Sequence, residues 1–110
     1  MAAAVIRLLR TLDTKPGTNN LASQLERSGP GAGANYEEAR GAESPADFVH
    51  KVRVALKELR ETRYWLRLCL EANLVGRHDE LRSLIDECSQ LIAILTASAK
   101  TAKRRVDKRK

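Results

Sequence analysis

The sequence contains no long apolar run. No stretch reaches the roughly 18 consecutive apolar residues of a membrane-spanning helix, and the first residues, MAAAVIRLLRTL, lack the cationic start and cleavage site of a signal peptide. We therefore expect a cytoplasmic protein with no membrane partner. At 110 residues the chain makes one small domain, which buries a limited fraction of its surface when it folds alone. Oligomerisation would relieve that limit.

Cysteine is scarce, with only Cys69 and Cys88 in the chain. Neither has a Cys or His neighbour at the spacing of a zinc site, and two cysteines make no disulfide framework. If their helices form a hairpin that turns near Gly76, Cys88 falls opposite Tyr64, about 7 to 8 Å along the axis from Cys69. Because that separation disfavours a disulfide within one chain, we expect two buried, free thiols.

Histidine is equally scarce, at His50 and His78 only. Di-metal helical bundles combine Glu residues with Glu-x-x-His motifs on two helices, whereas Glu58 and Glu61 have no histidine at that spacing. Two dispersed histidines also provide no nucleophile with a base and an orienting group. We expect no catalytic residue, no metal and no cofactor, and we expect that the protein is not an enzyme.

Three glycines, at positions 29, 31 and 33, resemble part of a phosphate-binding loop. No strand precedes them, however, and no Lys-Ser or Lys-Thr pair follows. Their expected role is to permit close helix packing or a bend. Pro30 lies among them and removes a backbone donor, so its helix should bend or divide in two near Arg27.

Positive charge is concentrated at the C-terminal end. Residues 1–99 hold 13 basic and 13 acidic side chains, while residues 100–110 hold seven basic and one acidic, so the whole net charge of +6 lies in the last eleven residues. Such a cluster resembles an arm for the phosphate backbone of nucleic acid, although bases also suit the negative end of a helix dipole. The basic residues are Lys100, Lys103, Arg104, Arg105, Lys108, Arg109 and Lys110.

Apolar residues recur at steps of three and four along the chain, which predicts the all-α class. The short links favour an antiparallel up-and-down four-helix bundle. The expected helices cover about residues 2–12, 18–42 with a bend near 29–31, 44–72 and 78–104, and a basic tail follows at 105–110.

The segment 44–72 is the most clearly defined helix. Ser44 is a good N-cap, Pro45 suits the first helical position, and Asp47 complements the positive end of the helix. One arc of this helix carries the residues expected to face the other helices, namely Phe48, Val52, Ala55, Leu56, Leu59, Leu66 and Leu70.

The end of this helix, residues 64–70, is apolar around most of its circumference. One core face cannot use all of these side chains, and an exposed ring as large as Trp65 marks an interface. We therefore expect self-association. The alternative is a wide core in which the first or second helix covers Trp65. The interface hypothesis names Val54, Tyr64, Trp65, Leu68 and Cys69.

A basic stripe occupies another arc of the same helix. It consists of Arg53, Lys57, Arg60 and Arg67, with Arg63 beside them. Such a stripe could follow phosphates in a groove or, in a ring of subunits, line a central channel. The alternative is an ordinary solvated face that is balanced by local acids such as Glu61, four residues after Lys57.

Three segments carry a family resemblance. LASQLERSG at 21–29, GANYEEA at 33–39 and SPADFVHKVRVALKELRETRYWLRL at 44–68 resemble the bacterial four-helix-bundle proteins called ribosomal-RNA intervening-sequence proteins. The resemblance covers about residues 8–103 and extends to order and spacing. It is strongest at Asn35, Glu37, Glu38, Asp47, Phe48, Lys51, Ala55, Leu56, Glu58, Glu61, Tyr64 and Trp65.

This resemblance implies a four-helix bundle that assembles as a ring-like homopentamer, and it implies no established activity. The related accessory variability proteins of retroelements share the pentamer, bind nucleic acid and engage a reverse transcriptase, and they carry a motif similar to Tyr-Trp-Leu-Arg at 64–67. RNA or DNA and, by distant analogy, a protein such as a reverse transcriptase are the implied partners. The chain departs from the family in a shorter first helix and in Pro30 with Gly31.

The polar residues of the family pattern have a structural interpretation. Inter-helix hydrogen bonds and ion pairs can set the register of adjacent helices, and a broken buried pair leaves an uncompensated charge. The residues concerned are Asn35, Glu37, Glu38, Lys51, Glu58 and Glu61.

Two functions remain open on the sequence. The first is a non-enzymatic oligomeric bundle that binds RNA or DNA non-specifically through the basic tail and the basic stripe. The second is a protein-interaction scaffold with no nucleic-acid role.

Overall fold

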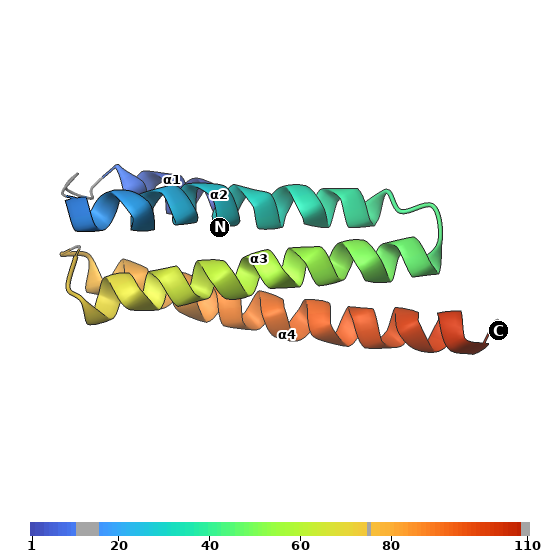
Figure 1. The fold of residues 1–110 in the computed structure, drawn as a ribbon. Helices are drawn as coiled ribbons and strands as arrows, with labels where there is room; N and C mark the ends of the chain where they lie inside the picture. The colour runs from blue at the N-terminus through green and yellow to red at the C-terminus, as the bar shows by residue number, and fades with distance from the viewer. Residues whose placement is uncertain (11–15, 75, 109–110) are drawn as a thin grey trace.

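Four helices and no strand make up the described residues, which are 1–10, 16–74 and 76–108 of a computed structural model. The helices are α1 (Ala2–Leu9), α2 (Pro16–Arg40), α3 (Pro45–Glu71) and α4 (His78–Lys108). They run alternately up and down in a rod of 52 × 20 × 19 Å (Figure 1). The predicted all-α antiparallel bundle is therefore confirmed, while its assembly into a ring stays a prediction.

The helix ends follow the local sequence closely. Ser44 caps α3 by accepting a hydrogen bond from the backbone N–H of Asp47 at 3.1 Å, and Asp47 Oδ2 accepts one from the N–H of Glu43 at 3.2 Å. At the other end of α3, Asn73 adopts a left-handed conformation with φ of 54°, and Leu74 N donates to Cys69 O. These two caps set the length of the central helix.

Three helix ends differ from the expectation. Helix α1 ends at Leu9, with Arg10 as its C-cap, before the predicted end at Leu12. Helix α4 continues to Lys108, so residues 105–108 of the predicted tail are helical, with Ala102 buried and Val106 half-buried beside them. Helix α2 begins at Pro16, which suits the first helical position. The predicted end of the first helix at Leu12 and the last two basic residues, Arg109 and Lys110, lie outside the described residues.

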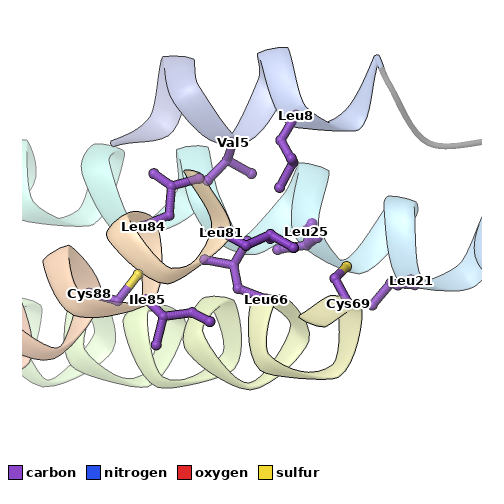
Figure 2. Packing of buried hydrophobic residues seen from close by; sticks show 10 residues of the cluster. All are labelled: Val5, Leu8, Leu21, Leu25, Leu66, Cys69, Leu81, Leu84, Ile85 and Cys88. Atoms are coloured by element: carbon purple, nitrogen blue, oxygen red, sulfur yellow. The ribbon is translucent and has the colours of Figure 1, made fainter. Parts of the chain in front are cut away.

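The core changes along the rod. At the end where α3 meets α4, all four helices contribute buried side chains, as Figure 2 shows. In the other half only α2, α3 and α4 contribute, because α1 is short and begins near the middle of the bundle (Figure 1). Helix α3 supplies residues to both halves and is the central element. None of the described helices combines the length and apolar content that crossing a membrane requires.

Pro30 lies inside α2 without dividing it. The helix is continuous from Pro16 to Arg40, so one of the two expected alternatives, a division into half-helices, is wrong, while the bend near residues 29–31 stays a prediction. Proline leaves the carbonyl four residues earlier without a helical donor, and that carbonyl belongs to Glu26, which is exposed to water. Of the three glycines, Gly29 has the expected packing role, because a Cβ there would lie 3.2 Å from Val5 Cγ1 of α1, whereas a Cβ at Gly33 would meet no atom within 4 Å.

A buried polar pair joins α2 to α3. Thr62 and Ser28 are both 0% exposed, and their hydroxyl oxygens are 2.9 Å apart. Thr62 Oγ1 also lies 2.8 Å from the carbonyl oxygen of Glu58. The sequence could have indicated that Thr62 is buried, since it lies on the same helical arc as Leu59 and Leu66. A search for apolar residues alone does not find it, because threonine is polar.

Both cysteines are buried and free, as expected. Loss of hydration raises the pKa of Cys69 to about 11. Burial, with a contribution from the charge of Glu87, raises the pKa of Cys88 to the same value of about 11. Since the thiolate is the nucleophile, neither side chain is reactive at neutral pH.

Gly33 and Gly29 provide a matched test of the α1–α2 contact. No atom lies within 4 Å of a Cβ built at Gly33, so Gly33→Ala should stabilise the protein by about 1 kcal/mol through helix propensity. Gly29→Ala should be the less stable of the two variants, because its methyl group meets Val5. Urea unfolding of both measures the difference. Equal stabilisation would show that α1 does not pack at Gly29.

Thr62→Val should destabilise the protein by about 1 to 3 kcal/mol, because it leaves the buried Ser28 hydroxyl without its partner. Adding Ser28→Ala should recover part of that loss in a double-variant cycle. The free energy of unfolding in urea is the measurement, with the exposed Ser23→Ala as the control. A Thr62→Val variant as stable as the parent would contradict this role.

Both thiols should react with a thiol-specific reagent at pH 8 only as fast as the protein unfolds. Their burial and their raised pKa values each lower the concentration of accessible thiolate. Absorbance of the released chromophore, followed with and without urea, gives the rate. Rapid labelling of the folded protein at Cys69 or Cys88 would contradict the buried placement.

Candidate nucleic-acid interface

A groove of about 590 Å³ runs between α3 and α4. Its floor is formed by small and apolar parts of Leu56, Thr96 and Ala99. Its walls are basic, and the lining cations are Arg53, Arg60, Lys100, Lys103 and Arg104. No carboxylate is among its lining residues.

Helical spacing places these cations. Arg53 and Arg60 are seven residues apart, which is two turns or about 10.5 Å along the same face of α3. Lys100, Lys103 and Arg104 recur at steps of three and four on one face of α4. Helices α3 and α4 run side by side in opposite directions (Figure 1), and both sets of cations line the groove between them.

Most of these cations have no protein counter-charge. Among the described residues, Arg53, Arg60, Lys100 and Arg104 form no ion pair, whereas Lys103 Nζ lies 3.1 Å from Asp107 Oδ1. Like charges gathered along one groove repel each other. The groove is therefore a site of positive potential, and a bound anion would lower the repulsion between its cations.

The opposite side of α3 is neutralised. Arg27 of α2 forms ion pairs with both Glu58, at 3.1 Å, and Glu61. The hydrogen bond to Glu61 is the largest cause of the raised pKa of Arg27, and the negative charge of Glu58 is the next. Lys51 Nζ lies 3.1 Å from Asp47 Oδ2, and this contact lowers the pKa of Asp47.

The polar residues of the family pattern thus make contacts within and between helices. Lys51 also reaches Glu38 of α2 at 3.9 Å, Asn35 donates to the carbonyl of Gly31, and Glu37 pairs with Arg40. Sequence reasoning missed Arg27 as the partner of Glu58 and Glu61. Within the part of the chain that the structure describes, no cluster of His, Cys, Asp or Glu could hold a metal.

The residues of the basic stripe on α3 lie in different environments. Arg53 and Arg60 enter the groove, while Lys57 and Arg67 are exposed outside its lining. Arg63 is half-buried and donates to Ser89 Oγ of α4 at 3.3 Å. The suggested balance between Lys57 and Glu61 is not formed among the described residues, because Glu61 is engaged by Arg27.

The basic C-terminal residues also divide. Lys100, Lys103 and Arg104 line the groove, whereas Arg105 lines a separate depression between the C-terminal parts of α2 and α4. Lys108 is exposed near the end of α4. Of the five basic residues that the structure describes here, three therefore line the groove together with Arg53 and Arg60.

The proposed interface residues have different environments. Cys69 is 0% exposed in the chain's own core, so its assignment to an interface is wrong. Trp65 and Leu68 pack against the same core, as the wide-core alternative expects, and Val54 is half-buried. Tyr64 is 57% exposed. Sequence reasoning missed Ile94 of α4, which at 60% is the most exposed large aliphatic side chain among the described residues.

Comparison with known proteins agrees with this architecture. A solved structure of a protein of unknown function from the S23 ribosomal protein family of Bacteroides thetaiotaomicron has 32% sequence identity and a TM-score of 0.80, over 90% of this chain and 91% of that one. A search of curated proteins gives no match. The model of the 23S rRNA-intervening sequence protein family matches residues 1–97. With most of its length matched in both sequence and fold, the chain belongs to the 23S rRNA-intervening sequence protein family.

Proposed function

We propose that this chain is a non-enzymatic cytoplasmic protein that binds the phosphate backbone of RNA or DNA, without sequence preference, in the α3–α4 groove. The observation that carries the proposal is the set of four cations without ion pairs among the described residues, Arg53, Arg60, Lys100 and Arg104, along one groove without a carboxylate in its lining. Phosphate oxygens would provide the negatively charged partner that these four cations do not have among the described residues. Release of counterions from the nucleic acid then drives association.

The shape of the groove supports a linear polyanion. Its cations lie along both helices rather than around one point, and the groove follows the long axis of the rod. Its apolar floor contributes no hydrogen-bonding code for a particular base. Contacts of this kind position a backbone and give affinity with little specificity.

A protein-interaction scaffold is the second candidate function. Ile94 on α4 and Tyr36 on α2 are exposed large side chains, and α1 covers only half of the bundle. Exposed apolar surface of this kind favours self-association or a protein partner. Under this proposal the chain forms a homo-oligomer, a pentamer by family resemblance, and does not need nucleic acid.

The double variant Arg60→Ala/Lys100→Ala should weaken binding to a mixed-sequence RNA of about 15 nucleotides. It should also lower the slope of log affinity against log salt concentration by about 1.4, since it removes two phosphate contacts to a single strand. Fluorescence anisotropy at several salt concentrations measures both quantities. Point variants are preferable to a chain ending at Ala99, because that truncation removes the buried Ala102.

Arg77→Ala/Arg82→Ala is the matched control. It removes the same charge from exposed residues that pair with Glu80 and Asp79 near the start of α4, far along the helix from the groove. Equal weakening by both double variants would show that total charge, not the groove, binds RNA. Absence of binding by the parent protein at low salt would leave the scaffold function.

A further inference from the structure

Tyr64 is an exposed aromatic ring within the basic surface of α3. It follows Arg60 by four residues and precedes Arg67 by three, so all three side chains are neighbours on the helix surface. Lys57 lies two turns before it on the same side. Arg60 lines both the α3–α4 groove and the adjoining depression that contains Tyr64. The ring is therefore continuous with the proposed phosphate site.

The ring of Tyr64 is supported by the core. Its centroid lies 4.9 Å from that of Trp65 in an edge-on arrangement with an interplanar angle of 63°. Trp65 packs against the buried cluster shared by all four helices. Tyr64 nevertheless remains 57% exposed, more than the 40% of the other tyrosine, Tyr36. Arg27, Arg60 and Glu61 line the same depression, and Glu61 is already paired with Arg27. A positioned aromatic ring that stays open to solvent there is suited to contact a flat, uncharged group.

We infer that Tyr64 stacks on an unpaired nucleobase, so that this surface selects single-stranded over double-stranded nucleic acid. The inference rests on the proposed function, because it requires the groove to hold the backbone. Single-strand-binding surfaces combine a basic groove with aromatic side chains that stack on bases, and this stacking tolerates any base. In a duplex the base faces are already stacked on one another and cannot reach the ring.

The spacing of the cations allows them to bind phosphates while Tyr64 contacts a base. Arg53 and Arg67 are fourteen residues apart on α3, which corresponds to about 21 Å along the helix axis. Tyr64 lies within that interval, and Lys100 and Arg104 extend the basic surface across the groove to α4. A single strand can follow the cations with its phosphates and turn a base toward Tyr64.

Tyr64→Leu should weaken binding to a thymidine oligomer of about 15 nucleotides by about tenfold, the effect of losing one base–aromatic stack. Binding to an abasic oligomer of the same length, and to a blunt duplex, should be unchanged. Tyr64→Phe should retain parent affinity, and Tyr36→Leu is the control for losing an exposed tyrosine. Anisotropy gives the affinities. The emission of Trp65, the only tryptophan, should respond to the thymidine oligomer and not to the abasic one.

Each contrary outcome is distinguishable. A Tyr64→Leu variant that binds the thymidine oligomer as well as the parent would overturn stacking, while the groove proposal stands if Arg60→Ala/Lys100→Ala still weakens binding. Equal loss for thymidine and abasic oligomers, with a lower mass by light scattering, would place Tyr64 in a self-association contact instead. If the parent protein binds none of the probes at low salt, the proposed function and this inference both fail.

Discussion

The burial of α3 between α2 and α4 is the constraint on which the other features depend. Val52, Ala55 and Leu66 of α3 are 0% exposed; Val52 and Ala55 lie in one half of the core and Leu66 lies in the other. Each fully buried Leu or Val side chain contributes roughly 1.5 to 3 kcal/mol. With two flanking helices in contact, α3 has one remaining exposed arc, and all of its charged residues must share it. The register of α3 therefore determines which charges meet which neighbour.

Residues 1–99 carry no net charge, but the paired and unpaired charges of α3 lie on different sides of its exposed arc. On the α2 side, Arg27 forms ion pairs with Glu58 and Glu61. These ion pairs and the buried hydrogen bond between Thr62 and Ser28 hold α2 against α3. On the α4 side, Arg53 faces the basic end of α4 without a counter-charge among the described residues. The same packing that stabilises one side of the helix thus leaves a cationic groove on the other.

Local chemistry and periodicity were sufficient to predict the bundle. Ser44 caps α3 through the backbone N–H of Asp47, as the sequence indicates, because a cap depends on neighbours in the chain. Tertiary contacts were not predictable in this way. Gly29 is small because Val5 of another helix lies against it, and Cys69 was assigned to an interface because periodicity does not show how wide a core is. The groove joins residues far apart in sequence, so only the packing of α3 on α4 reveals it.

Nuclear magnetic resonance of isotopically labelled protein during titration with a single-stranded oligonucleotide tests the central claim most directly. We expect the largest shifts of backbone amides and arginine Nε–H groups at Arg53 and Arg60, on the α4 side of α3, and at Lys100 of α4. Lys51, whose charge is already paired on the α2 side and which lies outside both the groove and the Tyr64 depression, should change little. Shifts centred on the α2 side, or spread evenly over all basic residues, would contradict the claim that the register of α3 creates the binding groove.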